Sequence, residues 1–279
     1  EPTASTAKAA REKGIDVVED FFGVRLAETL KKADLILGNN VLAHVPDIND
    51  FVGGLKITLK PGGTITMEFP HILNLIKYTQ FDTIYHEHFS YLSLFAVERI
   101  FREYGLKIYD VEEIPTHGGS LRVYACHSDF KCDVNVNVGN LLQKEKMANL
   151  NNITGYSGLQ RNAEKIKLNF ISFLINAKNE GKKVAAYGAA AKGNTLLNFC
   201  GIKNDLIDFV VDGAPSKQGR FLPGSHILIV KEEELRKFKP DYIIIFPWNI
   251  RDEILNQLKY VKEWGCKFVV TIPELEIIG

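Results

Sequence analysis

The segment 183–195 reads KVAAYGAAAKGNT, and it decides the fold of the end of the chain. Its first five residues are a short apolar run, which is typical of a buried strand. Gly188 opens a loop, and a helix that contains Asn194–Phe199 is predicted to follow. From this segment onward, short predicted strands and helices alternate. We therefore expect a doubly wound α/β domain over residues 181–279.

The loop in this segment has the spacing of a phosphate-binding loop, GxxxxGK[ST], but Asn194 stands where that loop has lysine. A nucleoside triphosphatase is therefore excluded. Backbone N–H groups at a helix N-terminus, with Lys192 nearby, suit a diphosphate instead. The stretch 212–220, DGAPSKQGR, follows the next strand and adds Lys217 and Arg220 at the same sheet edge. The alternative is two ordinary strand–helix loops.

The first 128 residues alternate in the same way, and we expect a second α/β domain there with a mostly parallel sheet. Residues 129–180 are polar, rich in Asn and Lys, and lack a strand pattern, so a helical connector is predicted. In the first domain, the predicted strands span residues 16–19, 34–38, 64–69, 107–113 and 121–126. The predicted helices span residues 3–13, 26–32, 48–59 and 95–104.

The composition excludes several classes of protein. Lys plus Arg and Asp plus Glu each number 34, and this balance argues against a general nucleic-acid binder. No apolar run approaches the ~18 residues of a membrane span. The four cysteines form no CxxC pair, so we expect a reduced, cytoplasmic protein. A metal shared by Cys126, His127 and Cys132 is the alternative, but a fourth ligand with known spacing is missing.

The segment 81–93, FDTIYHEHFSYLS, is the richest in groups that transfer protons. Five such side chains occupy seven positions: Tyr85, His86, Glu87, His88 and Tyr91. Imidazoles titrate near neutral pH, a carboxylate can orient them, and a phenol can donate to a developing oxyanion. A zinc site at His86 and His88 lacks a third ligand. The remaining alternative is a polar helix start on the surface.

Further polar side chains follow the predicted strands of the first domain, where ligands of open α/β sheets bind. They are Asn39, Asn40, His44 and Glu68. The stretch 117–122, HGGSLR, joins the last two predicted strands of this domain. Its glycines permit a close approach of the backbone to a ligand, and Arg122 suits a phosphate. An Asn-rich turn and a tight loop are the alternatives.

Together these motifs resemble the S-adenosylmethionine-dependent C-methyltransferases that act on nucleotide-linked keto-deoxysugars. The resemblance spans nearly the whole chain. The specific motifs are FDTIYHEHFSY and HGGSLR, whereas the Pro-Gly-Gly turn at residues 61–63 is shared by many methyltransferases. The other matching stretches are GNNVLAHVPD at 38–47, EFP at 68–70, YGAAAKGNT at 187–195 and DGAPSKQGRFLPGSHI at 212–227.

The resemblance implies a Rossmann-like methyltransferase domain, N-terminally incomplete here, followed by a second doubly wound α/β domain. It also implies a cysteine-rich zinc domain and a glycine-rich cofactor loop, and neither has a counterpart in these residues. We therefore expect that the sequence is part of a longer polypeptide. Zinc is expected only in that other domain, and no metal site is expected in this chain.

The resemblance also implies roles for individual residues. His88 is implied as the catalytic base, with Glu87 and Tyr85 as its companions and His44 as a second active-site imidazole. S-adenosylmethionine is the implied cofactor, and the residues implied to bind it are Glu1 at the ribose, Asp20 and Phe21 at the adenine, and Asn39 near the sulfonium. A small-molecule nucleotide sugar is the implied substrate, with no nucleic-acid or membrane partner. The residues expected to bind this substrate are His117, Arg122, Lys192, Asn194, Lys217 and Arg220.

The expected reaction is methylation of a carbon beside the ketone of a 4-keto-deoxysugar, through an enolate. Two alternatives are a methyltransferase that acts on another small-molecule acceptor, and a nucleotide-sugar-binding fragment without activity. A nicotinamide oxidoreductase is disfavoured, because no GxGxxG motif follows a predicted strand.

Overall fold

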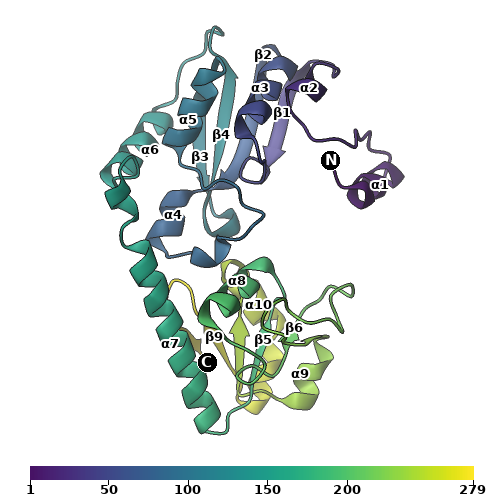
Figure 1. Ribbon diagram of the computed structural model, residues 1–279, viewed down its shortest axis with the longest axis vertical. Coiled ribbons are helices and arrows are strands. Elements are labelled where there is room, and N and C mark those ends of the chain that lie inside the picture. The colour runs from purple at the N-terminus through teal and green to yellow at the C-terminus, as the bar shows by residue number, and fades with distance from the viewer. The chain divides into compact units, whose positions relative to one another are not determined.

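The computed structural model describes residues 1–279, which form two compact units (Figure 1). The first unit comprises residues 1–73 and 87–152, and the second comprises residues 74–86 and 153–279. The chain therefore returns from the second unit to the first between His86 and Glu87, inside the proton-transfer segment. The helices of residues 129–180 are divided between the two units. The division into domains at residues 128 and 180 stays a prediction.

The first unit contains a mixed four-stranded sheet in the order β1-β2-β4-β3 (Figure 1). Only β1 and β2 are parallel, whereas β4 pairs antiparallel with both β2 and β3. The expectation of a mostly parallel sheet was wrong here, because β3 and β4 are joined by the short turn around Gly118 and such a turn forces an antiparallel pair. The strands are β1 (Ala33–Asn39), β2 (Leu59–Pro70), β3 (Leu106–Ile114) and β4 (Ser120–His127).

Helices cover this sheet, and side chains cap the N-termini of three of them. Asp47, Ser93 and Asn135 accept hydrogen bonds from the first backbone N–H groups of α3, α5 and α6, respectively. The helices are α1 (Ala4–Glu12), α2 (Val24–Ala27), α3 (Ile48–Thr58), α4 (Ile72–Lys77, which crosses into the second unit), α5 (Leu94–Glu103), α6 (Val136–Met147) and the short η2 (Thr116–Gly118). The core between them includes Phe51, Leu55, Met67, Phe69 and Phe101.

The strand predicted for residues 16–19 does not form. Arg11 instead donates to the carbonyl of Val17 and the carboxylate of Glu19, each over 3.1 Å. As a result, β1 is the edge of the sheet, and its Leu35 and Leu37 are 54% and 65% exposed. The helix predicted for residues 26–32 is shorter than expected, since α2 ends at Ala27.

The second unit contains a six-stranded sheet in the order β10-β9-β8-β5-β6-β7 (Figure 1). All neighbouring strands are parallel except β10, which runs antiparallel to β9. This doubly wound arrangement confirms the expectation from segment 183–195. The strands are β5 (Val184–Tyr187), β6 (Val210–Val211), β7 (Ile229–Val230), β8 (Tyr242–Ile245), β9 (Lys267–Val270) and β10 (Glu276–Ile278).

The helices of this unit are α7 (Leu159–Asn179), α8 (Ala191–Cys200), α9 (Glu233–Phe238) and α10 (Arg251–Gln257), with the short turns η1 (Phe81–Thr83), η3 (Ile153–Tyr156), η4 (Trp248–Ile250) and η5 (Lys259–Trp264). The helix predicted over residues 251–263 is divided at Leu258 into α10 and η5. The segment 74–86 joins this unit through η1, where Phe81 packs on Phe199 with ring centroids 4.9 Å apart. No helix in the chain is both long enough and apolar enough to cross a bilayer.

Candidate functional sites in the two units

In the first unit, two neighbouring strands end beside each other and bring polar groups together. The backbone N–H of Asn40, just after β1, donates to the carbonyl of Glu68 in β2 over 2.8 Å. Asn40 has a positive φ of 54°, and its side-chain Oδ1 is buried without a hydrogen-bond partner. A left-handed backbone and an unpaired buried acceptor are both costly, and such features cluster at functional sites.

The imidazoles of His44 and His88 meet at this end of the sheet. The backbone N–H groups of Phe89 and Ser90 both donate to the carbonyl of Ala43, over 2.9 and 3.2 Å. This double contact brings His88 against His44, with ring centroids 4.6 Å apart and the planes at 69°. Tyr91 lies edge-on to His88 at 6.0 Å. Both imidazoles are half-buried, so a ligand can reach them from solvent.

An ion pair lies between β2 and β4 near the same end. Glu68, which is 7% exposed, accepts from the guanidinium of Arg122 over 3.1 Å and from the hydroxyl of Thr116 over 2.9 Å. The hydrogen bond to Glu68 raises the pKa of Arg122. Arg122 also lies 3.6 Å from Glu112. Because Arg122 faces two carboxylates, an incoming phosphate would compete with both.

Sequence reasoning missed a buried pair in this unit. Nε2 of His71 lies 2.8 Å from Oε1 of Glu145, and both side chains are at most 2% exposed. The same carboxylate accepts the backbone N–H groups of Leu94 and Phe95, over 2.6 and 2.9 Å, at the start of α5. The helix dipole favours an anion at this position. Glu145 is part of α6, so these contacts connect α6 with His71 at the end of β2 and with the start of α5.

In the second unit, the predicted phosphate-binding lysine Lys217 is already engaged. It donates to the carbonyl of Ala189 over 2.9 Å and to Asp212 over 3.2 Å. Asp212 in turn accepts the backbone N–H groups of Ala189 and Ala214, each over 2.8 Å. These contacts tie the loop after β5 to the loop after β6. Arg220, by contrast, is exposed.

A second buried cluster lies at the start of α8. Oδ2 of Asp82, in η1, accepts the indole N–H of Trp248 over 2.8 Å, while Oδ1 is buried without a partner. The ammonium of Lys192 lies 4.2 Å from the ring centroid of Trp248 and donates to Asn249 over 2.8 Å. Burial raises the pKa of Asp82 to about 6. Burial also lowers the pKa of Lys192, against the opposing charge of Asp82.

Of this cluster, sequence reasoning identified only Lys192. Trp248 and Asn249 lie in the loop that follows β8, so the rule that ligands bind at the carboxyl ends of strands points to them. Asp82 belongs to the segment singled out for its imidazoles, but its partner lies 166 residues away along the chain. No local pattern indicates that contact.

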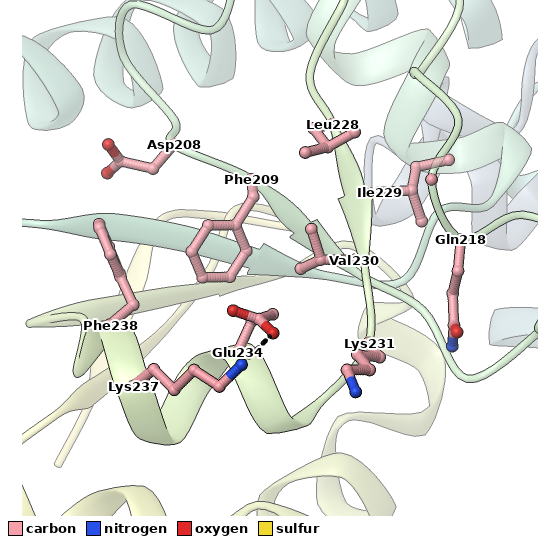
Figure 2. A pocket seen from close by; sticks show the side chains of 11 residues that line it. Asp208, Phe209, Gln218, Leu228, Ile229, Val230, Lys231, Glu234, Lys237 and Phe238 are labelled. Atoms are coloured by element: carbon pink, nitrogen blue, oxygen red, sulfur yellow. Dashed lines mark hydrogen bonds and ion pairs between the residues drawn. The ribbon is translucent and has the colours of Figure 1, made fainter.

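A pocket of about 730 Å³ lies elsewhere in the second unit, between α9 and strands β6 and β7 (Figure 2). Figure 2 shows Phe209 and Phe238 on its apolar side and the Lys237–Glu234 ion pair, 2.7 Å long, beside it. Its lining runs from Asp208 and Phe209, which precede β6, to Gln218, whose side-chain amide donates to the carbonyl of Asp212 over 2.9 Å. None of the lining residues belongs to the Asp82 cluster.

The comparisons with known proteins agree with this architecture. A family model of the C-methyltransferase C-terminal domain matches residues 115–273, and a model of a methyltransferase domain matches residues 4–111. The C-methyltransferase NovU of Streptomyces niveus is 33% identical over 283 residues, an alignment that covers 100% of this chain and 67% of that protein. The chain belongs to the C-methyltransferase family.

Solved structures of other methyltransferases are more distant from this C-methyltransferase. A methyltransferase of Thermotoga maritima is 17% identical, with a TM-score of 0.38, over 46% of this chain and 71% of that chain. The 1,6-didemethyltoxoflavin-N1-methyltransferase of Burkholderia thailandensis is 16% identical, with a TM-score of 0.33, over 45% and 57% of the two chains.

As a member of this family, the C-methyltransferase uses S-adenosylmethionine. The residues predicted to bind this cofactor differ in their exposure and in the hydrogen bonds that they already make. Phe21 is 69% exposed, so its ring face is open to a planar base. Asp20 is held by Arg25 over 2.5 Å, and this bond lowers the pKa of Asp20. Glu1 is exposed and accepts the backbone N–H of Thr3 over 2.9 Å. Asn39 is exposed, whereas Asn40 beside it carries the unpaired acceptor, which fits a ligand N–H donor.

The remaining predicted residues are placed as follows. Glu87 is exposed and belongs with His88 to the first unit, whereas Tyr85 belongs to the second unit. His117 is exposed in η2 with a positive φ of 56°. Asn194 lies in the first turn of α8, and its Oδ1 is buried without a partner. The roles of these residues stay predictions.

Proposed function

We propose that this C-methyltransferase methylates a carbon beside the ketone of a nucleotide-linked 4-keto-deoxysugar. The observation that supports the proposal is the pair of half-buried imidazoles, His44 and His88, at the carboxyl end of the parallel strands β1 and β2. A carbon next to a ketone becomes nucleophilic only after a base removes its proton. Methyl transfer to oxygen or nitrogen needs no such enolate, so paired imidazoles favour a carbon acceptor.

His88 is the proposed base. Its neutral imidazole takes the α-proton, and the electron pair of the C–H bond moves into the enolate. His44, in edge contact with His88, is proposed to hold the imidazolium or to donate to the enolate oxygen. Glu87, next to His88 in the chain, is proposed to stabilise the positive charge on His88. Tyr85 is proposed as a further hydrogen-bond donor.

When bound, S-adenosylmethionine supplies an electrophilic methyl group. The role proposed for the chain is to align the substrate carbon with that group and to exclude competing water. Asn40, with its unpaired acceptor, and Phe21, with its exposed ring, are the residues whose surroundings best suit cofactor contacts. Asn39, Asp20 and Glu1 are proposed to line the same region.

Deuterium uptake tests the proposal. In heavy water, a 4-keto nucleotide sugar should exchange its α-proton in the presence of the enzyme and gain a methyl group on that carbon. His88→Ala should lower both rates by about 10²-fold or more, the usual contribution of a general base. His86→Ala removes an exposed imidazole two residues away and serves as the matched control.

Two results would count against this assignment. Exchange by His88→Ala at the rate of the wild type would exclude His88 as the base. A labelled methyl group found only on oxygen or nitrogen acceptors would exclude carbon methylation and leave a methyltransferase of a different acceptor class.

A further inference from the structure

Two of the four cysteines face each other at the end of β4. Sγ of Cys126, in β4, lies 3.3 Å from Sγ of Cys132, and both residues carry free thiols. The two sulfurs are therefore about 1.3 Å further apart than in a disulfide, where they lie about 2.05 Å apart. Cys132 belongs to the irregular segment before α6, so no helix or strand ladder prevents its backbone from moving this far.

Several contacts hold the segment of Cys132 against the strand of Cys126. Lys107 in β3 is the cross-strand partner of Cys126, and its ammonium donates to the carbonyls of Phe130 and Cys132 over 2.6 and 3.3 Å. A Cβ on Gly62 would lie 3.5 Å from the ring of Phe130, so the segment also packs against the turn before the long part of β2. The two thiols are therefore kept together by the fold.

The two thiols differ in how easily a reagent in solvent can reach them. Cys126 is 1% exposed, whereas Cys132 is only partly buried. Burial, together with the contact to Cys132, raises the pKa of Cys126 to about 12. A small oxidant from solvent therefore meets Cys132 first, and Cys126 lies directly behind it.

A metal shared by these thiols and His127 was the alternative that the sequence left open. His127 follows Cys126 directly in β4, so its side chain points to the opposite face of the strand. Nε2 of His127 lies 3.1 Å from the carbonyl oxygen of Leu59. The imidazole therefore does not join the two thiols around one ion, and the chemistry left to the pair is that of a dithiol.

The pair lies at the end of the first sheet that is remote from the paired imidazoles. Because β4 runs antiparallel to β2, His127 at the end of β4 lies beside Leu59 at the start of β2. His44 and His88, by contrast, lie at the carboxyl end of β1 and β2. The redox chemistry of the thiols is therefore independent of the proposed methyl transfer.

We propose that Cys132 and Cys126 form a reversible disulfide pair, in which Cys132 reacts first with a peroxide and Cys126 then displaces the product. The Cys132 thiolate attacks one oxygen of hydrogen peroxide, the O–O bond breaks, and Cys132 becomes a sulfenic acid while hydroxide leaves. The Cys126 thiolate attacks the Cys132 sulfur, the S–S bond forms, and a second hydroxide leaves. The protons of the two thiols convert both hydroxides to water. Two thiols thus lose two electrons, and one peroxide is reduced to two waters.

Peroxide treatment of the whole chain, followed by blocking of the remaining thiols and tryptic digestion without reductant, tests the proposal. Trypsin cleaves after Lys131, which places Cys126 in peptide 123–131 and Cys132 in peptide 132–144. We expect mass spectrometry to find these two peptides joined. Dithiothreitol added before the thiols are blocked should return both cysteines to thiols, because a disulfide is reducible and the higher sulfur acids are not.

Three variants assign the roles of the two thiols. Cys126→Ala keeps an apolar side chain at the buried position and removes the second thiol. Dithiothreitol should then recover about fivefold less Cys132, with the rest of peptide 132–144 carrying two or three added oxygens. In Cys132→Ser, which does not depend on the folding of the first variant, the buried Cys126 should stay a thiol. Cys200→Ala removes a buried thiol of the second unit and is the matched control, so its linkage should equal that of the wild type.

Four results would overturn the proposal. Peptide 132–144 of the wild type could carry irreversible oxidation beside an intact Cys126 thiol, or neither cysteine could react. The joined peptides could occur only in chains that migrate as a dimer without reductant, which would assign the bond to two molecules. Oxidation of Cys126 in Cys132→Ser at the rate of the wild type would show that Cys132 does not react first.

Discussion

His71 and Glu145 form a fully buried pair whose facing atoms, Nε2 and Oε1, lie 2.8 Å apart. Glu145 also accepts two backbone N–H groups at the start of α5, so one carboxylate serves three groups from two other segments. Breaking such a pair leaves buried polar groups without partners, which is more costly than losing a surface ion pair.

Glu145→Ala should therefore lower the free energy of unfolding of the first unit by about 3 kcal/mol. Urea unfolding followed by circular dichroism measures the loss. The control is Glu98→Ala, which removes the i,i+4 pair with exposed Arg102 and should cost less than about 1 kcal/mol. Equal losses for the two variants would show that Glu145 does not hold α5 and α6 in place.

Asn40→Gly separates the backbone role of Asn40 from its side-chain role. Glycine adopts a positive φ without strain, so the stability of the fold should stay within about 1 kcal/mol of the wild type. The unpaired Oδ1 is lost, so the affinity for S-adenosylhomocysteine, measured by titration calorimetry, should fall about tenfold, or ~1.4 kcal/mol. An equal or larger loss in Asn39→Ala with none in Asn40→Gly would assign the contact to Asn39.

The stability of the second unit should depend on pH through Asp82. Burial raises its pKa from 3.8 to about 6, so the folded state binds the proton more tightly than the unfolded state. This stabilising contribution is present at pH values below 4 and is lost as pH rises to about 6. At ~1.36 kcal/mol per pKa unit, the loss is about 3 kcal/mol.

The comparison with Asp82→Asn isolates this effect. The difference in unfolding free energy between the wild type and Asp82→Asn should shift by about 3 kcal/mol between pH 4 and pH 8, against the wild type at the higher pH. Urea titrations at several pH values provide the measurement. A difference that is flat across this range would mean that Asp82 titrates as an ordinary exposed carboxyl.

Alkylation should distinguish the four cysteines. Burial raises the pKa of Cys126, Cys200 and Cys266 to about 12, which leaves little reactive thiolate at pH 8. Cys132 is only partly buried. Iodoacetamide in the absence of denaturant should label Cys132 first, and the other three only after unfolding, as read by peptide mass spectrometry. Early labelling of Cys200 or Cys266 would contradict the described core.

Local patterns predicted most of the fold. The run Asp34–Gly38 forms the centre of β1, and segment 183–195 forms β5, its loop and the start of α8. These signals depend on apolar runs and glycine, which act within a few residues. The direction of β4 and the failure of residues 16–19 to pair depend on contacts between distant segments, so sequence periodicity could not predict them.

The same distinction holds for the candidate sites. The composition of segment 81–93 and the position of His44 after a strand could be predicted, but their pairing depends on the hydrogen bonds from Phe89 and Ser90 to Ala43. The Asp82–Trp248 bond is beyond local reasoning for the same reason. Sequence reasoning assigned Lys217 to phosphate binding from its charge alone. The ion pair between Lys217 and Asp212 could not be predicted in this way.

Trp248 gives the enzyme a built-in optical reporter. The chain has two tryptophans. The other one, Trp264, ends η5 and donates its indole N–H to the carbonyl of Pro240. Trp264→Phe would therefore leave one indole, with an ammonium over its ring and a carboxylate on its nitrogen. Its emission would follow the arrival of any ligand that disturbs either charge, so occupancy could be recorded in real time without a label.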